Sequence, residues 1–204
     1  GNYLSQGLYK NTADFQFRLT VLDDSTDLTP QYFKRLSKEK DNIQYLHPEA
    51  AFKGLDEILN LGLEKTECQY LVILTNSSLV EPGWIGYPLQ LMKENPKMAA
   101  IAGKTVKPNG TIENAGVILC DNEIRNVGKD EPGHRYSFVY QVDAVGSNAC
   151  LFRREAIKGG FDFSYYLPFG GLEDIDYCLS LKEQGWDIYY CGCGTVYHIE
   201  AALK

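Results

Sequence analysis

Apolar blocks alternate with amphipathic stretches along the first half of the chain. The apolar blocks "FQFRLTVL", "NIQYL", "QYLVILT" and "MAAIAGKTV" predict strands, and the third is typical of a parallel strand covered on both faces. Helices are predicted to open at Thr29-Pro30 and at Glu81-Pro82, and "AFKGLDEILNLGL" predicts another that ends near Gly62. This order predicts an α/β fold whose central sheet is doubly wound, mostly parallel and flanked by helices.

The second half of the chain predicts a smaller antiparallel part. "KPNGT" separates two extended runs and predicts a hairpin turn. Residues 121–137 are polar and aperiodic, which predicts a loop over a site. Strands are expected in "FVYQVDAVG", "NACLFR" and "WDIYYCGCGTVYHI", with a short helix at 154–158. Because there is neither a repeat nor a linker, we expect residues 1–204 to form a single domain.

The stretch "LEDIDYCLSLKEQGW" predicts an amphipathic helix with Glu173, Asp174 and Asp176 in its first turn. Carboxylates there interact favourably with the positive end of the helix dipole. At about 100° per residue, Glu173 and Asp176 share a polar side, whereas Asp174 lies close to the apolar stripe of Leu172 and Ile175. A carboxylate on an apolar side is costly unless another group needs it. Asp174 is therefore a candidate for chemistry, with a purely helix-starting role as the alternative.

Charge and hydropathy exclude some classes of protein. The 204 residues carry a formal net charge of −7, and the Lys and Arg residues are scattered, which argues against a nucleic-acid partner. No apolar run approaches the roughly 20 residues of a transmembrane helix, so no such segment is expected. The chain begins with Gly1 rather than Met, which suggests a domain cut from something longer.

The cysteines indicate a reducing compartment. There are six, and most lie within apolar runs, where a free cysteine packs as a small hydrophobe. A disulfide framework is typical of shorter secreted chains, so we expect free thiols and a cytoplasmic protein. Cys191, Cys193 and His198 raise the alternative of a zinc site, but no second cluster completes four ligands and the segment is predicted to be a strand.

Eight short motifs follow one another along the chain. They are "VLDDSTDLT", "GLDEILNLGL", "YLVILTNSSLVEPGW", "NGTIENAGV", "GSNACLFRREAI", "GGFDFSYY", "LEDIDYCLSLKEQGWDIYY" and "VYHIE". In the order of these motifs, from about Phe15 to Ile199, the chain resembles family 2 glycosyltransferases. The resemblance implies a GT-A fold, also described as the nucleotide-diphospho-sugar transferase fold, and transfer from a nucleotide-sugar donor to a glycan or other hydroxyl acceptor with inversion.

The resemblance also implies roles for particular residues. The acids after "VL" would bind the nucleotide base and ribose, the "ED" carboxylates would form the catalytic pair with Asp174 as general base, and the late histidine would hold a metal or the diphosphate. Two predicted strands end at Asp23 and Thr75, and open sheets bind ligands at such strand ends. The implied site comprises catalytic Asp174 and Glu173, nucleotide-sugar-binding Asp23, Asp24, Thr75, Asn76 and Ser77, and His198 and Ser77 as weak metal candidates.

Two departures from the family pattern leave alternatives open. Ser77 stands where the family carries a metal-binding Asp, and a hydroxyl is a poor ligand for Mg²⁺ or Mn²⁺. A divalent cation is thus an uncertain cofactor, and the diphosphate charge could instead meet protein groups: His198, Arg153, Arg154, Lys104 or backbone amides. The family's first strand is also missing before "NYLSQGLYKNT", which looks like the tail of a helix. A catalytically silent GT-A domain is therefore the second hypothesis, and a sugar nucleotidyltransferase the third.

Overall fold

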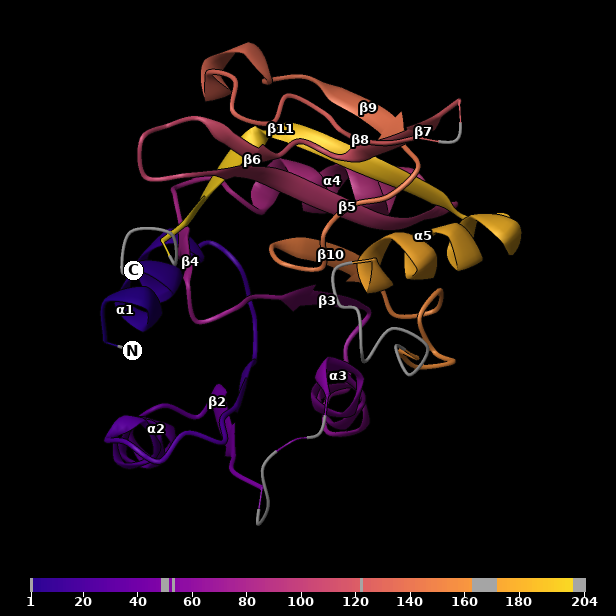
Figure 1. The fold of residues 1–204 in the computed structure, drawn as a ribbon. Helices are drawn as coiled ribbons and strands as arrows, with labels where there is room; N and C mark the ends of the chain where they lie inside the picture. The colour runs from indigo at the N-terminus through magenta and orange to yellow at the C-terminus, as the bar shows by residue number, and fades with distance from the viewer. Residues whose placement is uncertain (1, 49–51, 53, 122, 163–171, 200–204) are drawn as a thin grey trace.

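Helices and strands alternate through the first hundred residues, as the sequence pattern predicts (Figure 1). The protein is represented by a computed structural model that describes residues 2–48, 52, 54–121, 123–162 and 172–199. The elements of this half are α1 (Asn2–Asn11), β1 (Leu19–Leu22), α2 (Thr29–Glu39), β2 (Ile43–Leu46), α3 (Leu55–Glu64), β3 (Tyr70–Ile73), β4 (Ser78–Val80), α4 (Gly86–Glu94) and β5 (Met98–Val106).

One predicted helix start in this half is wrong. We expected α4 to open at Glu81-Pro82, but its first residue is Gly86. Gly83 has a φ of 79°, a left-handed conformation that a right-handed helix cannot include. Trp84, 4% exposed, then turns its indole inward, and Nε1 donates a hydrogen bond to Thr12 Oγ1 at 3.2 Å. The chain therefore makes a turn that buries Trp84 before the helix begins.

The second half holds short strands and the acidic helix. Its elements are β6 (Ile112–Asn114), β7 (Val117–Cys120), β8 (Glu123–Asn126), the 3₁₀ turn η1 (Gly133–Arg135), β9 (Val139–Val142), β10 (Cys150–Arg153), α5 (Glu173–Glu183) and β11 (Asp187–His198). The predicted loop at 121–137 is wrong in part, since β8 forms an antiparallel hairpin with β7 and η1 follows. Every residue of β8 is exposed, so this strand lacks the apolar positions by which a buried strand is recognised in a sequence.

The predicted helix at 154–158 is also wrong, because this segment forms successive turns. The Ala156 N–H donates to the Arg153 carbonyl, and the Gly160 N–H donates to the Ile157 carbonyl. "KPNGT" does make the predicted hairpin turn, in which the Lys107 N–H donates to the Thr111 carbonyl at 2.9 Å. α5 covers the predicted acidic stretch, and Gly185 follows it with a φ of 88°, as a helix-ending glycine should.

The larger sheet has the strand order β3-β10-β5-β11-β4, with β6 also paired to β5 and β9 to β11. The predicted α/β class, flanking helices and smaller antiparallel part are confirmed. The sheet is mixed rather than mostly parallel: β5 and β11 pair in parallel, whereas β10 lies antiparallel between β3 and β5. "QYLVILT", expected to be covered on both faces, is only half-buried in β3. The reason is that strands from the second half occupy central positions.

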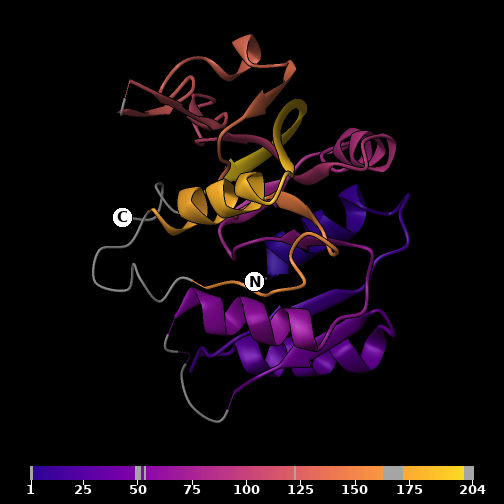
Figure 2. The ribbon, with the colours of Figure 1, turned by 90° about the vertical axis from the view of Figure 1, so that its right-hand side faces the viewer.

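Two hydrophobic clusters pack on the two faces of this sheet. One includes Cys178 and Leu181 of α5, together with Ile188 of β11, and the other includes Met92 of α4 and Val196 of β11. Figure 2 shows α4 and α5 on opposite sides of the sheet. All nine residues of β5 are buried, as expected for a strand covered on both faces.

β1 and β2 form a separate parallel pair within the described part of the chain. The pair lies with α2 and α3 at one end of the molecule, and the β7–β8 hairpin lies at the other end (Figures 1 and 2). The predicted helix near the start of the chain is α1, which packs against β4. Among the described residues, no helix has both the length and the apolar character needed to cross a membrane.

Candidate functional site

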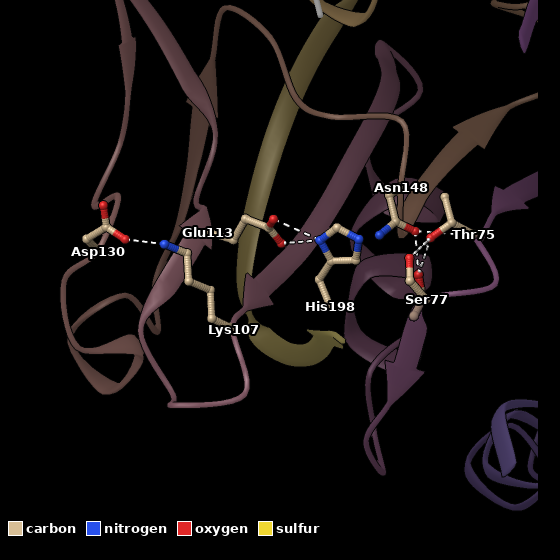
Figure 3. Close-up of polar contacts among 8 residues, drawn as sticks. Thr75, Ser77, Lys107, Glu113, Asp130, Asn148 and His198 are labelled. Atoms are coloured by element: carbon tan, nitrogen blue, oxygen red, sulfur yellow. Dashed lines mark hydrogen bonds and ion pairs between the residues drawn. The ribbon is translucent and has the colours of Figure 1, made fainter. Parts of the chain in front are cut away.

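A closed network of hydroxyl and amide groups forms where the chain leaves β3 and enters β4. Thr75 Oγ1 lies 2.9 Å from Ser77 Oγ and 3.0 Å from Ser78 Oγ. Asn148 Oδ1 accepts hydrogen bonds from the Thr75 N–H at 3.1 Å and from Ser78 Oγ at 2.6 Å. Ser77 and Ser78 are both 6% exposed, whereas Thr75 and Asn76 are exposed. The exposed Thr75 hydroxyl thus links the two buried serines, and Figure 3 shows its side chain beside those of Ser77 and Asn148.

The turn that leads into β10 carries Asn148 into this network. Ala149 has a φ of 59°, a left-handed conformation that is unfavourable for a residue with a Cβ. Backbone conformations of this kind cost about 1–3 kcal/mol and cluster at functional sites. The Ala149 N–H donates to the Ile73 carbonyl at 2.9 Å, so β3 holds the strained turn in place.

The same turn contacts the first turn of α5. The Ser147 N–H donates a hydrogen bond to Asp174 Oδ2 at 3.1 Å, and a Cβ added at Gly146 would lie 3.9 Å from that oxygen and 3.8 Å from Asn114 Nδ2. Asp174 thus faces a polar wall built from the turn before β10 and the end of β6. Asp174 and the hydroxyl network therefore contact consecutive residues, Ser147 and Asn148, of the same turn.

The environments of Asp174 and Asp176 differ as helical spacing predicts. Asp174 is half-buried, whereas Asp176 is exposed and lines an open depression of about 870 Å³ on another side of α5. Burial raises the pKa of Asp174, hydrogen bonds from Ser147 act in the opposite direction, and the negative charge of Glu173 raises it further. A carboxyl with a raised pKa, fixed by one oxygen, is suited to accept a proton.

His198 lies at the end of β11, beside this network. Its position in the sheet register is opposite Ser78 of β4. Both carboxylate oxygens of Glu113, on β6, lie 2.8 Å from His198 Nδ1. In Figure 3 the imidazole stands between Glu113 and the side chains of Ser77 and Asn148. The structure therefore brings the histidine together with the residues of the 75–78 segment.

Asp23 and Asp24 follow β1, as predicted, and their contacts are with the β1–β2 part of the molecule. Asp23 Oδ2 accepts a hydrogen bond from Tyr45 Oη at 2.8 Å, and Oδ1 accepts one from the Ser25 N–H at 3.2 Å. Asp24 is exposed, and its Oδ2 lies 3.4 Å from the Phe52 nitrogen. Asp24 is thus the more accessible of the two acids.

Three of the cationic side chains considered for the diphosphate are engaged in the fold. The Arg153 guanidinium, 9% exposed, donates to the backbone carbonyls of Met92, Met98 and Asn95. Arg154 donates to the carbonyls of Thr66 and Leu63, and Lys104, 8% exposed, donates to the carbonyl of Gly133. These cations are held by backbone carbonyls of neighbouring segments. His198, the fourth side chain considered for the diphosphate, bonds to Glu113.

The residues present do not fit a preformed divalent-cation site. Mg²⁺ and Mn²⁺ favour carboxylate oxygens, but Ser77 supplies a hydroxyl and the nearby Glu113 carboxylate is engaged by His198. Among the residues that the structure describes, no three His, Cys, Asp or Glu side chains are grouped as metal ligands.

The "CGCG" segment of β11 has a packing explanation. Cys191 is buried and Cys193 is exposed, and the charge of the neighbouring Cys193 adds to burial in raising the pKa of Cys191. A Cβ at Gly192 would lie 1.9 Å from the Tyr136 carbonyl oxygen, and one at Gly194 would lie 2.4 Å from that of Trp84. The glycines therefore permit the backbone of β11 to approach two neighbouring segments.

Sequence reasoning missed three residues of this site: Glu113, Ser147 and Asn148. They lie in the motifs "NGTIENAGV" and "GSNACLFRREAI", so the motifs marked the correct segments without identifying the side chains. Their partners are 85, 27 and 73 residues away along the chain. These pairings could not be read from local spacing.

Comparison with known proteins identifies the family and the fold. The family model described as glycosyl transferase family 2 matches residues 14–161. No curated protein sequence matches the chain significantly. The structure is similar to that of GalNAc-T7, solved with UDP, GalNAc and Mn²⁺, with a TM-score of 0.73, 15% identity and 96% of this chain covered. It is also similar to residues 1–349 of S. aureus TarS in complex with UDP, with a TM-score of 0.66, 16% identity and 96% of this chain covered.

The chain spans only part of both of these proteins, 39% of GalNAc-T7 and 55% of TarS. The two structural similarities confirm the predicted GT-A fold. At 15% and 16% identity, these similarities show the fold alone. The activity has to be inferred from the residues of the site itself.

Proposed function

The chain belongs to glycosyl transferase family 2, and we propose that it moves a sugar from a nucleoside-diphosphate donor to an acceptor hydroxyl. The observation that carries this proposal is the position of Asp174. Its carboxyl is half-buried, one oxygen is held by the Ser147 N–H, and the hydroxyl network of Thr75, Ser77 and Asn148 begins one residue further along the same turn. Both similar structures are of proteins with bound UDP, which supports a nucleotide donor.

The proposed chemical step is a displacement with inversion at the anomeric carbon. The acceptor oxygen forms a bond to that carbon as the bond to the diphosphate oxygen breaks on the opposite side. The acceptor proton passes to Asp174 Oδ1, because Oδ2 already accepts the Ser147 N–H. The raised pKa of Asp174 makes it a stronger base than an exposed carboxylate. Glu173 contributes through its charge, which raises that pKa further.

The donor is proposed to lie between two groups of residues. Asp23 and Asp24 would bind the base and ribose, and Thr75, Asn76 and Ser77 would face the sugar diphosphate. Of these, Thr75, Asn76 and Asp24 are exposed and accessible, whereas Ser77 is buried and acts through its bond to Thr75. His198 would face the diphosphate. As candidate metal ligands, Ser77 and His198 supply only a hydroxyl and an imidazole.

A catalytically silent GT-A domain is the second candidate. The hydroxyl of Ser77 favours it, since the family places a metal-binding carboxylate there. Such a domain would bind a sugar nucleotide, a glycan or a protein partner without transfer.

The deciding experiment measures binding and transfer with the same protein. Thermal shift with UDP, GDP, ADP and CDP, each with EDTA or with Mn²⁺, identifies the nucleotide, because a ligand that binds the folded state raises Tm by mass action. Hydrolysis or transfer from the matching nucleotide sugars is then measured with a panel of hydroxyl acceptors. Binding with turnover supports the enzyme, and binding without turnover supports the silent domain. If no nucleotide raises Tm, the donor site is wrong.

A further inference from the structure

A carboxylate–imidazole pair joins two strands that flank the end of β5. Glu113 lies on β6, which pairs with β5 through Thr105 and Val106, and His198 ends β11, which pairs with the same two residues. Both Glu113 oxygens lie 2.8 Å from His198 Nδ1, and the two side chains are 34% and 22% exposed. Because the same central strand holds both backbones, the separation of the two groups is set by the sheet.

The pair determines which nitrogen of the imidazole is turned toward the site. An oxygen acceptor at Nδ1 requires a proton on Nδ1, and this selects the tautomer and restrains rotation of the ring. Figure 3 shows the other ring nitrogen of His198 turned toward Asn148 and Ser77, away from Glu113. Nε2 is thus presented to the segment proposed to face the donor diphosphate.

The rest of the site makes the orientation of this ring important. Arg153, Arg154 and Lys104 all donate to backbone carbonyls, so they are not placed to meet a diphosphate. Ser77 supplies a hydroxyl rather than a carboxylate, and its oxygen lies 2.9 Å from Thr75 Oγ1. The neighbouring Lys107 forms an ion pair with Asp130. Of the side chains considered for the diphosphate, His198 is the one beside the 75–78 segment.

We propose that Glu113 is a positioning residue that acts through His198: it holds Nε2 toward the diphosphate of the nucleotide donor. This inference rests on the proposed function, because it assumes that a nucleoside diphosphate occupies the site. Glu113 itself does not touch the donor. Loss of a partner that orients a site histidine typically costs about 10–100-fold in affinity or activity.

The test is isothermal titration of the protein with UDP, the nucleotide bound in both similar structures, in EDTA and again in Mn²⁺. Glu113→Ala and His198→Ala are each expected to weaken UDP binding by about 10-fold or more. Glu113→Gln is expected to retain most of the affinity, because its amide oxygen still accepts the Nδ1 proton. Glu123→Ala is the matched control, since Glu123 is exposed on the β7–β8 hairpin and is expected to leave binding unchanged.

Two readouts separate positioning from general structural damage. The double variant Glu113→Ala/His198→Ala is expected to bind UDP no more weakly than His198→Ala alone, because residues that act through one contact are not additive. The ¹⁵N NMR spectrum of His198 is expected to show a protonated Nδ1 in the wild type and in Glu113→Gln, and a changed tautomer population in Glu113→Ala. The Tm of each variant shows whether it is folded.

The outcomes distinguish this inference from the proposed function. If His198→Ala weakens UDP binding and Glu113→Ala does not, or if the two losses add in the double variant, the role of Glu113 is refuted and the donor site stands. If UDP fails to bind the wild type and the wider nucleotide panel also fails, the proposed function is overturned and this inference with it. If Glu113→Ala and His198→Ala lose the same UDP affinity in EDTA as in Mn²⁺, Nε2 acts on the diphosphate without a cation.

Discussion

The Ser147 N–H donates a hydrogen bond to Asp174 Oδ2 at 3.1 Å, which joins the turn before β10 to the first turn of α5. The contact fixes one carboxylate oxygen, Oδ2, and in the proposed step the acceptor proton passes to the other. It also opposes the effect of burial on the Asp174 pKa, because a donor stabilises the ionised form that burial disfavours. Burial is the larger of the two effects, so the Asp174 pKa lies above its usual value.

Asp174→Asn is expected to lower the rate of sugar transfer by about 10²–10⁴, the usual contribution of a positioned general base. Donor affinity should remain near that of the wild type, because the amide keeps the size and the bond from Ser147. Asp176→Asn is the matched control on the same helix turn, and as an exposed acid it should change the rate little. A side-by-side assay decides: equal, mild losses would mean that both acids only start the helix.

The same substitution is expected to change how stability depends on pH. Burial raises the Asp174 pKa in the folded protein, whereas the unfolded chain ionises near about 3.9. As pH rises from the unfolded to the folded pKa, the unfolded state loses its proton first, so the wild type loses stability in that window. Asp174→Asn lacks this loss, and its Tm relative to the wild type should increase from pH 3.5 to pH 7. A Tm difference that is constant with pH would contradict the raised pKa.

Asp24→Ala is expected to weaken UDP binding with little change in Tm, because Asp24 is exposed. Asp23→Ala should weaken binding and also lower the free energy of unfolding by about 1–3 kcal/mol, since Tyr45 and Ser25 lose an acceptor. Titration calorimetry and thermal melts measure the two effects. Asp41→Ala, an exposed acid outside the proposed site, is the control. Unchanged UDP affinity in both site variants would place the nucleotide elsewhere.

Ser77→Asp is expected to make UDP binding dependent on Mn²⁺, because it places a carboxylate where a hard cation could bind together with the diphosphate. The affinity should rise by about 10-fold or more in Mn²⁺ relative to EDTA, which corresponds to about 1.4 kcal/mol. Ser77 is 6% exposed, so the variant should also lose stability. Ser77→Ala is the control and should gain no metal dependence. A metal effect as large in the wild type as in Ser77→Asp would show that Ser77 is not the missing ligand position.

The thiols are expected to react in two classes. All six cysteines are free, with Cys68 and Cys193 exposed and Cys150, Cys178 and Cys191 buried. Burial raises the pKa of Cys178 to about 12, so its thiol is protonated and inert at neutral pH. A thiol reagent should modify the exposed pair rapidly in the native protein and titrate six thiols after denaturation without reductant. Recovery of two or fewer would indicate disulfides and an oxidising compartment.

Local patterns in the sequence determined much of the secondary structure. The predicted strand "MAAIAGKTV" is β5, Pro30 lies in the first turn of α2, and the turn "KPNGT" makes its hairpin. The 100° spacing of residues in a helix also places Asp174 and Asp176 on different sides of α5. These features follow from φ/ψ preferences and burial within a few residues, which a short stretch of sequence encodes.

The tertiary structure decided how distant segments meet. β10 inserts antiparallel between β3 and β5, and this placement brings Asn148 to Thr75 across 73 residues. β6 and β11 both pair with β5, which brings Glu113 to His198 across 85 residues. Strand order and register depend on competition among all possible pairings, and the alternation within each strand fixes only which face is buried. For this reason the position of Asp174 on its helix could be predicted from the sequence. The contacts of Ser147 with Asp174 and of Glu113 with His198 depend on the fold.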